Sequence, residues 1–155
     1  QIAREEGVTT ILNPAPVHEE LPPEFYPLTD VICPNEHETE YLTGLPVSTI
    51  QEAEKAAEQL LGWGTQTVLL TLGERGSLLV NRHIRKHFPA ETVTAYDTTG
   101  AGDSFIGSTA YLLSRGYNIE DAVSRATKIA AISIQTSGAQ SSFPDRKDLP
   151  SGILP

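Results

Sequence analysis

Short apolar segments alternate with helix-like segments along this chain, and this alternation constrains its fold more than any other feature. The clearest apolar segment is residues 67–71, Thr-Val-Leu-Leu-Thr, which has the length and composition of a buried strand. Similar segments cover residues 8–12 and 31–33, and prolines, which cannot continue a sheet, follow both. Strands that alternate with helices predict an α/β layered fold with a largely parallel central sheet.

Capping residues mark the ends of the predicted helices. Asn35 precedes a helix that Gly44 closes, and Ser48 or Thr49 precedes another that runs to Leu61. The remaining predicted elements are a helix end at 1–7, a proline-rich connection at 21–25, a hairpin of 77–80 and 84–88, a helix reaching Gly116, a last helix over about 119–136, a polar loop at 138–142 and an irregular end from 144.

Charge and cysteine content exclude several classes of protein. The 155 residues carry a net charge of −9 and give a pI near 4.8, which argues against nucleic acid or an anionic membrane as partner. Cys33 is the single cysteine and cannot form an internal disulfide, as suits a reducing cytosol. No apolar run reaches the length of a membrane span. Because the sequence begins at Gln1 rather than Met, we expect a fragment of a longer protein.

Residues 97–105, Asp-Thr-Thr-Gly-Ala-Gly-Asp-Ser-Phe, have the pattern of a turn that leads into a helix, with a strand end predicted at 93–95. Gly100 and Gly102 let the backbone approach a ligand closely, and amides at a helix N-terminus favour an anion. Asp103 in that place could take the proton from a hydroxyl that attacks a phosphoryl group. The alternative is a plain turn with a carboxylate stabilised by the helix dipole.

Residues 97–107 resemble the C-terminal signature of the PfkB family of carbohydrate kinases, which has the ribokinase-like fold. Residues 13–16, 34–38, 71–76 and 138–142 agree with that family in order and spacing, closer to its ribokinase branch than to its fructokinase or adenosine kinase branches. The resemblance covers the chain up to about Pro150. It implies one α/β domain over residues 1–155, the C-terminal nucleotide-binding and catalytic portion of such a kinase, without the family's N-terminal lid.

By that resemblance the chain is the catalytic half of an enzyme that transfers a phosphoryl group from ATP to the 5-hydroxyl of D-ribose. Asp103 is then the base and the one remaining sugar contact. The anion hole consists of the amides of Gly100, Ala101 and Gly102. The ATP-binding positions are Asn35, Thr71, Leu72, Gly73, Glu74, Arg75, Gly76, Gly102, Asp103 and Lys128, of which Lys128 stands where relatives often have Asn.

The resemblance also implies two metal ions. Glu38 would hold Mg²⁺ through water, and Asn35 would help to arrange it. An activating K⁺ would be held by oxygen atoms of Asp97, Thr99, Ser133, Thr136, Gly138 and Ser142. The alternatives are that Asn35 only caps a helix, that Glu38 is a solvated first-turn carboxylate, and that Asp97 and Ser142 only make hydrogen bonds within turns.

Two other functions stay open at this point. The chain could belong to a kinase of another sugar or nucleoside, because the sugar-binding half is absent. It could also be a catalytically silent nucleotide-binding or assembly module. The resemblance further implies a full-length parent that is a homodimer through its lid, in the cytoplasm or, as a second choice, the nucleus.

Overall fold

A computed structural model describes residues 1–17 and 21–154, and the chain divides into two compact units, Gln1–His87 and Phe88–Pro155. The first unit contains the strands, and the second contains the two longest helices. The prediction of one domain over residues 1–155 includes residues 18–20 and 155, which lie outside the described ones, and it stays a prediction.

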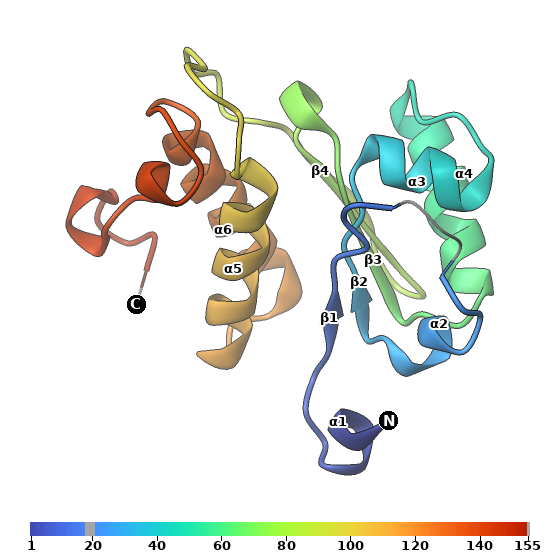
Figure 1. The fold of residues 1–155 in the computed structure, drawn as a ribbon. Helices are drawn as coiled ribbons and strands as arrows, with labels where there is room; N and C mark the ends of the chain where they lie inside the picture. Colours follow the sequence, from blue (N-terminus) through green and yellow to red (C-terminus); the bar gives the residue numbers. More distant parts are fainter. Residues whose placement is uncertain (18–20, 155) are drawn as a thin grey trace. The chain divides into compact units, whose positions relative to one another are not determined.

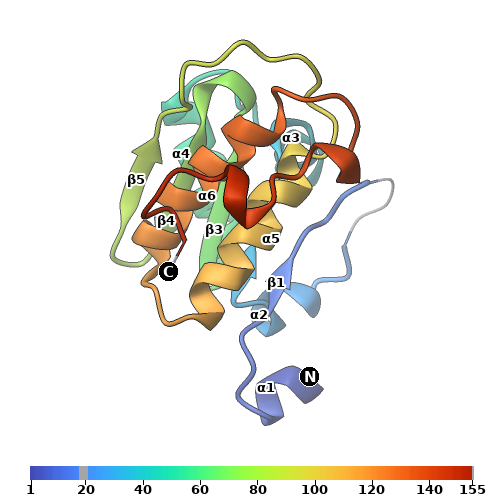
Figure 2. The ribbon, with the colours of Figure 1, turned by 90° about the vertical axis from the view of Figure 1, so that its left-hand side faces the viewer.

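Among the described residues the sheet has five strands in the order β1-β2-β3-β4-β5. Figure 1 labels the first four of them, and Figure 2 labels β5. The strands β1, β2 and β3 are parallel, and β4 runs antiparallel to β3. Ile32 of β2 lies between Leu12 and Val68 in this register. The largely parallel sheet is therefore confirmed. The strand bounds are β1 Ile11–Leu12, β2 Val31–Ile32, β3 Thr67–Thr71, β4 Ser77–Asn81 and β5 Arg85–Phe88.

The helices of the first unit begin at the capping residues that the sequence predicts. Asn35 caps α3 (Glu36–Thr43), and Thr49, rather than Ser48, caps α4 (Ile50–Gly62). Gly44 ends α3 in the left-handed conformation, with a φ of 69°. One face of α4 packs into the same apolar cluster as the central strands. Its buried residues are Ala53, Ala56, Ala57 and Leu60. Two single-turn helices, α1 (Ile2–Glu5) and α2 (Phe25–Leu28), complete the unit.

The second unit is built on α5 (Ala101–Ser114) and α6 (Ile119–Ser133), which pack side by side (Figure 2). Gly116, with a φ of 85°, ends α5, where the amide of Tyr117 donates to the carbonyl of Leu112 at 3.2 Å. Asn118 caps α6 by accepting from the amide of Asp121 at 2.9 Å. Two 3-10 turns follow, Gln140–Ser142 and Arg146–Asp148.

Four predicted elements differ from the structure. The strand predicted at 8–12 is only Ile11–Leu12 and is half-buried rather than buried, because it lies at the edge of the sheet with one neighbour. The strand end predicted at 93–95 is wrong, since a strand needs a hydrogen-bonded neighbour and this segment has none in the described structure. The last residue of the predicted proline-rich connection, Phe25, is already the first residue of α2. The helix α6 ends at Ser133 and not at residue 136.

Candidate functional site

In the first unit, three loops leave the same edge of the sheet because β1, β2 and β3 are parallel. Asn13 follows β1 directly, Asn35 follows β2 closely and Gly73 follows β3. Asn35 pairs with Thr71 across a parallel bridge, and the amide of Thr71 donates to the carbonyl of Pro34 at 3.0 Å. The predicted positions Asn35 and Thr71 are thus brought together.

Asn35 and Glu38 form a reciprocal cap at the start of α3. The amide of Glu38 donates to Asn35 Oδ1 at 2.8 Å, and the amide of Asn35 donates to Glu38 Oε2 at 2.8 Å. Asn35 therefore does cap a helix, as the alternative to a role in metal binding expected. The companion alternative, a solvated Glu38, is wrong, because this side chain is only 5% exposed.

The carboxylate of Glu38 lies in an unusual environment for an acid. Its negative charge lies near the buried thiol of Cys33. Burial is the first cause and the charge of Glu38 the second cause that raise the pKa of this thiol far above its ordinary range. The Oε1 atom of Glu38 has no hydrogen-bond partner among the described residues. A buried carboxylate with one free oxygen fits the chemistry of a hydrated Mg²⁺ ion, which prefers oxygen ligands and keeps several waters.

Residues 72–76 form a tight turn after β3. The amide of Leu72 donates to the carbonyl of Gly76 at 2.8 Å, and the amide of Gly76 donates to the carbonyl of Gly73 at 3.0 Å. Gly73 and Gly76 have φ angles of 53° and 93°, a region that favours glycine. The backbone at Gly73 and Glu74 is exposed, so a ligand can approach it closely.

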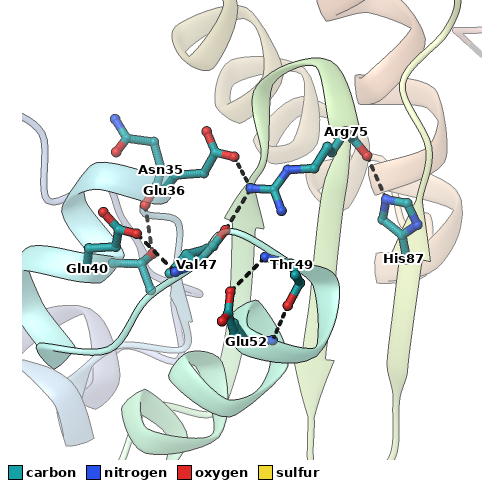
Figure 3. A network of polar contacts seen from close by, with 9 residues as sticks. Asn35, Glu36, Glu40, Val47, Thr49, Glu52, Arg75 and His87 are labelled. Atoms are coloured by element: carbon teal, nitrogen blue, oxygen red, sulfur yellow. Dashed lines mark hydrogen bonds and ion pairs between the residues drawn. The ribbon is translucent and has the colours of Figure 1, made fainter.

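The side chain of Arg75 turns back from this loop toward α3, as Figure 3 shows. Its Nη2 atom forms an ion pair with Glu36 and donates to the carbonyl of Val47 at 2.7 Å. The backbone carbonyl of Arg75 contacts His87 Nε2 at 2.6 Å. Sequence analysis did not single out Glu36, Val47 or His87, since partners this far apart in sequence leave no local pattern.

In the second unit, the turn at 97–100 delivers free amides to the start of α5. The amides of Gly100, Gly102 and Asp103 have no hydrogen-bond acceptor among the described residues. The amide of Ala101, which the resemblance places in the anion hole with Gly100 and Gly102, is not free, because it donates to the carbonyl of Thr98 at 3.2 Å. The Asp103 side chain is exposed beside these amides. Unpaired amides at a helix N-terminus favour an anion, and the adjacent carboxylate is free to accept a proton.

The Asp97 carboxylate joins this turn to the loop that follows α6. One oxygen accepts from the amide of Thr99 at 2.9 Å and the other from the amide of Gly138 at 2.8 Å. These bonds, that of Gly138 first, lower the pKa of Asp97. The amides of Tyr96 and Asp97 both donate to the carbonyl of Ile134, at 2.7 and 3.1 Å.

The predicted K⁺ ligands lie on this turn and the segment from the end of α6, which those bonds hold together. Ser133 and Ser142 are buried and donate their hydroxyls to the carbonyls of Ala130 and Ala139. The carbonyls of Thr136 and Gly138 accept no backbone hydrogen bond from a described residue, so they are available. Backbone and hydroxyl oxygens near a carboxylate suit a hard cation. No group of three His, Cys, Asp or Glu side chains within the described ranges could hold a metal ion by itself.

The remaining predicted site residue, Lys128, is exposed on α6 in the second unit. The resemblance implies that Asp103, Asn35 and Gly73 bind one ATP molecule and that Glu38 holds its Mg²⁺. Because the two units are described separately, this shared site stays a prediction. Among the helices that the structure describes, none has the length and apolar character needed to cross a membrane.

Comparison with known proteins identifies close relatives. Residues 1–146 match the pfkB family carbohydrate kinase. A ribokinase of Mus musculus is 47% identical over 157 residues, which cover 99% of this chain and 49% of that protein. A deoxyribokinase of Salmonella typhi is 39% identical over 144 residues, covering 93% of this chain and 47% of that protein.

A solved structure has the same fold. The structure of Arabidopsis thaliana ribokinase complexed with ribose and ATP is similar with a TM-score of 0.85 at 32% identity, over 93% of this chain and 47% of that chain. This chain thus spans about half the length of the relatives it matches.

Proposed function

The chain belongs to the pfkB family of carbohydrate kinases, and on this premise we propose that it is the nucleotide-binding, catalytic half of an ATP-dependent sugar kinase. The proposed reaction is phosphorylation of the 5-hydroxyl of D-ribose to give ribose 5-phosphate. The observation that carries the proposal is the group of unpaired amides at Gly100, Gly102 and Asp103, next to the exposed Asp103 carboxylate.

Each part of this turn has a role in phosphoryl transfer. The Asp103 carboxylate accepts the proton of the attacking hydroxyl, so the oxygen becomes a better nucleophile as it meets the γ-phosphorus. The free amides donate to the equatorial oxygens of the transferring group and stabilise its charge. Gly100 and Gly102 carry no side chain that would hold the phosphate away from these amides.

The first unit supplies the proposed nucleotide contacts. The exposed backbone at 73–74 approaches the ATP phosphates, and Thr71 borders them beside Asn35. Glu38 and Asn35 would hold Mg²⁺ through water, and the ion would supply positive charge to the phosphates. Asp97 and the carbonyls of Thr136 and Gly138 would hold K⁺, whose charge would help to order the turn. We further propose cytosolic action and, for a full-length parent, a homodimer.

The test is ADP release by the purified chain with Mg-ATP and ribose, with and without K⁺, for the natural sequence, Asp103→Asn and Asp121→Asn. Asp121 is a matched control because it occupies the same third position of α6 that Asp103 occupies in α5. Because this chain spans about half of its relatives, the same variants are also compared in a full-length parent, where we expect ribose-dependent turnover that falls by about three decades in Asp103→Asn and is retained in Asp121→Asn. Equal turnover in both variants would show that Asp103 is not the base.

A second candidate is a kinase of another sugar or nucleoside, which the 39% identity to a deoxyribokinase favours. A panel of ribose, 2-deoxyribose, fructose and adenosine in the same assay separates the two, since the preferred substrate gives the highest kcat/KM. Binding of Mg-ATP without turnover on any of the four would instead support a catalytically silent nucleotide-binding module.

A further inference from the structure

We propose that Arg75 and Glu36 act as a pair of positioning residues that set the geometry of the nucleotide loop, without contact between their charges and the nucleotide. This inference rests on the proposed function of the first unit. It concerns the side chain of Arg75, which turns toward Glu36 of α3 and the carbonyl of Val47 (Figure 3).

The ion pair of Arg75 and Glu36 connects the turn after β3 with the start of α3, two segments between which the sheet provides few hydrogen bonds. Glu36 is the first residue of α3, directly after Asn35, and Arg75 is the last residue of the 3-10 turn after β3. Between these loops the described backbone makes one isolated bridge, that of Asn35 and Thr71. The ion pair adds a second connection, farther from the strands, so the turn and the start of α3 move together.

Val47, whose carbonyl accepts a hydrogen bond from Arg75, is itself held in place. Val47 is 1% exposed, and its amide donates to Glu40 Oε1 at 3.0 Å, while its carbonyl accepts from Arg75. On the other side of the turn, His87 of β5 contacts the Arg75 carbonyl. Arg75 is therefore held by its side chain toward α3 and by its backbone toward β5, which leaves the exposed backbone at 73–74 with little freedom.

Charge gives a second reason for the pair. Glu36 lies beside the turn, and a methyl group built at Gly73 would be 3.8 Å from its Oε2 atom. An unpaired carboxylate there would repel the phosphates of a nucleotide that approached the turn. Arg75 neutralises this charge, so the guanidinium is needed even though it does not itself contact the phosphates.

The geometry also predicts which substitution preserves the function. A single nitrogen, Nη2, makes both contacts, while Nη1 is buried without a hydrogen-bond partner in the described structure. A lysine ammonium carries three donors on one nitrogen and has no second nitrogen to leave unpaired. Arg75→Lys can thus keep both contacts, whereas Arg75→Met loses both.

The experiment measures the dissociation constant of Mg-ATP for the purified chain by titration calorimetry, well below the unfolding temperature of every variant. We expect Arg75→Met and Glu36→Gln each to weaken binding by about five- to tenfold, and the double variant to be no weaker than either single one. Arg75→Lys should recover most of the affinity that Arg75→Met loses. The exposed pair of Arg85 and Glu58, with N–O distances of 3.0 and 2.8 Å, is the control, and its variants should bind as the natural chain does.

Three results would overturn the inference. Losses that multiply in the double variant would mean that the two residues act separately, and tighter binding by Glu36→Gln would mean that a freed Arg75 contacts the phosphates. A lower unfolding temperature with unchanged affinity would reduce the pair to a structural role. If the natural chain fails to bind Mg-ATP, the proposed function fails with it, whereas normal binding with uncoupled variants overturns this inference alone.

Discussion

In the turn at residues 97–103, which we propose to be catalytic, Gly100 is the residue at which a single added methyl group should destabilise the chain most. Its φ of 80° lies in the left-handed region, and a Cβ atom there would be 3.2 Å from both Ala139 Cα and Phe143 Cε1. The first neighbour is backbone, and the second is the ring edge of Phe143, a residue that is 37% exposed. Gly100→Ala therefore combines an unfavourable backbone conformation with a steric clash against the loop that follows α6.

Two other glycines of the second unit separate these costs. Gly116 has a similar φ of 85° but open space around a built Cβ atom, and Gly107 lies within α5, also with open space. We expect Gly116→Ala to lower the free energy of unfolding by about 1 kcal/mol through its backbone alone. Gly100→Ala should lower it by about 2 to 4 kcal/mol, because crowding adds to the backbone cost. Gly107→Ala should raise it by about 0.5 to 1 kcal/mol.

The assay is urea denaturation of the four proteins, followed by circular dichroism and by tyrosine fluorescence, with the slope of the transition compared among them. The order of stability is the test: Gly107→Ala above the natural chain, then Gly116→Ala, then Gly100→Ala. If Gly100→Ala were as stable as Gly116→Ala, the loop of Ala139 and Phe143 would yield easily. The close packing that we assign to the turn would then be refuted.

Two predictions concern ionisable groups. Because its bonds to two amides lower the pKa of Asp97, the carboxylate stabilises the fold above about pH 4, its ordinary pKa, and this contribution disappears as the pH falls through the lowered value. Stability measured from pH 5 to pH 2 should therefore fall less in Asp97→Asn than in Asp121→Asn, and equal falls would contradict the assignment. Since burial raises the pKa of Cys33, its thiol stays protonated at neutral pH. A disulfide reagent such as DTNB should leave the native chain unlabelled and label one thiol after unfolding, so rapid labelling of the native chain would be the contrary result.

Local sequence signals predicted the elements whose ends are set by local chemistry. Asn35 and Thr49 start helices where they were expected, because a capping side chain needs only its own next three residues. The β3 strand was predicted to the residue, since its apolar run is long enough to be buried between two neighbours. The family resemblance is confirmed by the match over residues 1–146.

The elements that the sequence did not predict depend on distant partners. The extent of β1 is set by the two residues of β2 that pair with it, and the segment at 93–95 pairs with no strand in the part of the chain that the structure describes. The same limit applies within the candidate site. The burial of Glu38 and the pairing of Arg75 with Glu36 arise from packing between segments that are separate in the chain, which no local pattern encodes.

The hydrogen bond between the Gly138 amide and the Asp97 carboxylate can form only late in the translation of this segment. The two residues are 41 positions apart, so at about 5 to 20 residues per second a ribosome makes the turn that begins at Asp97 some two to eight seconds before the loop that holds it. During that interval the nascent chain contains Asp103 and its glycines without the amide of Gly138 and the carbonyl of Ile134. The turn thus gains its final shape only near the end of translation of this segment. In a chain whose synthesis stalls before residue 134, the turn would be present in sequence but would lack the bonds that hold its shape.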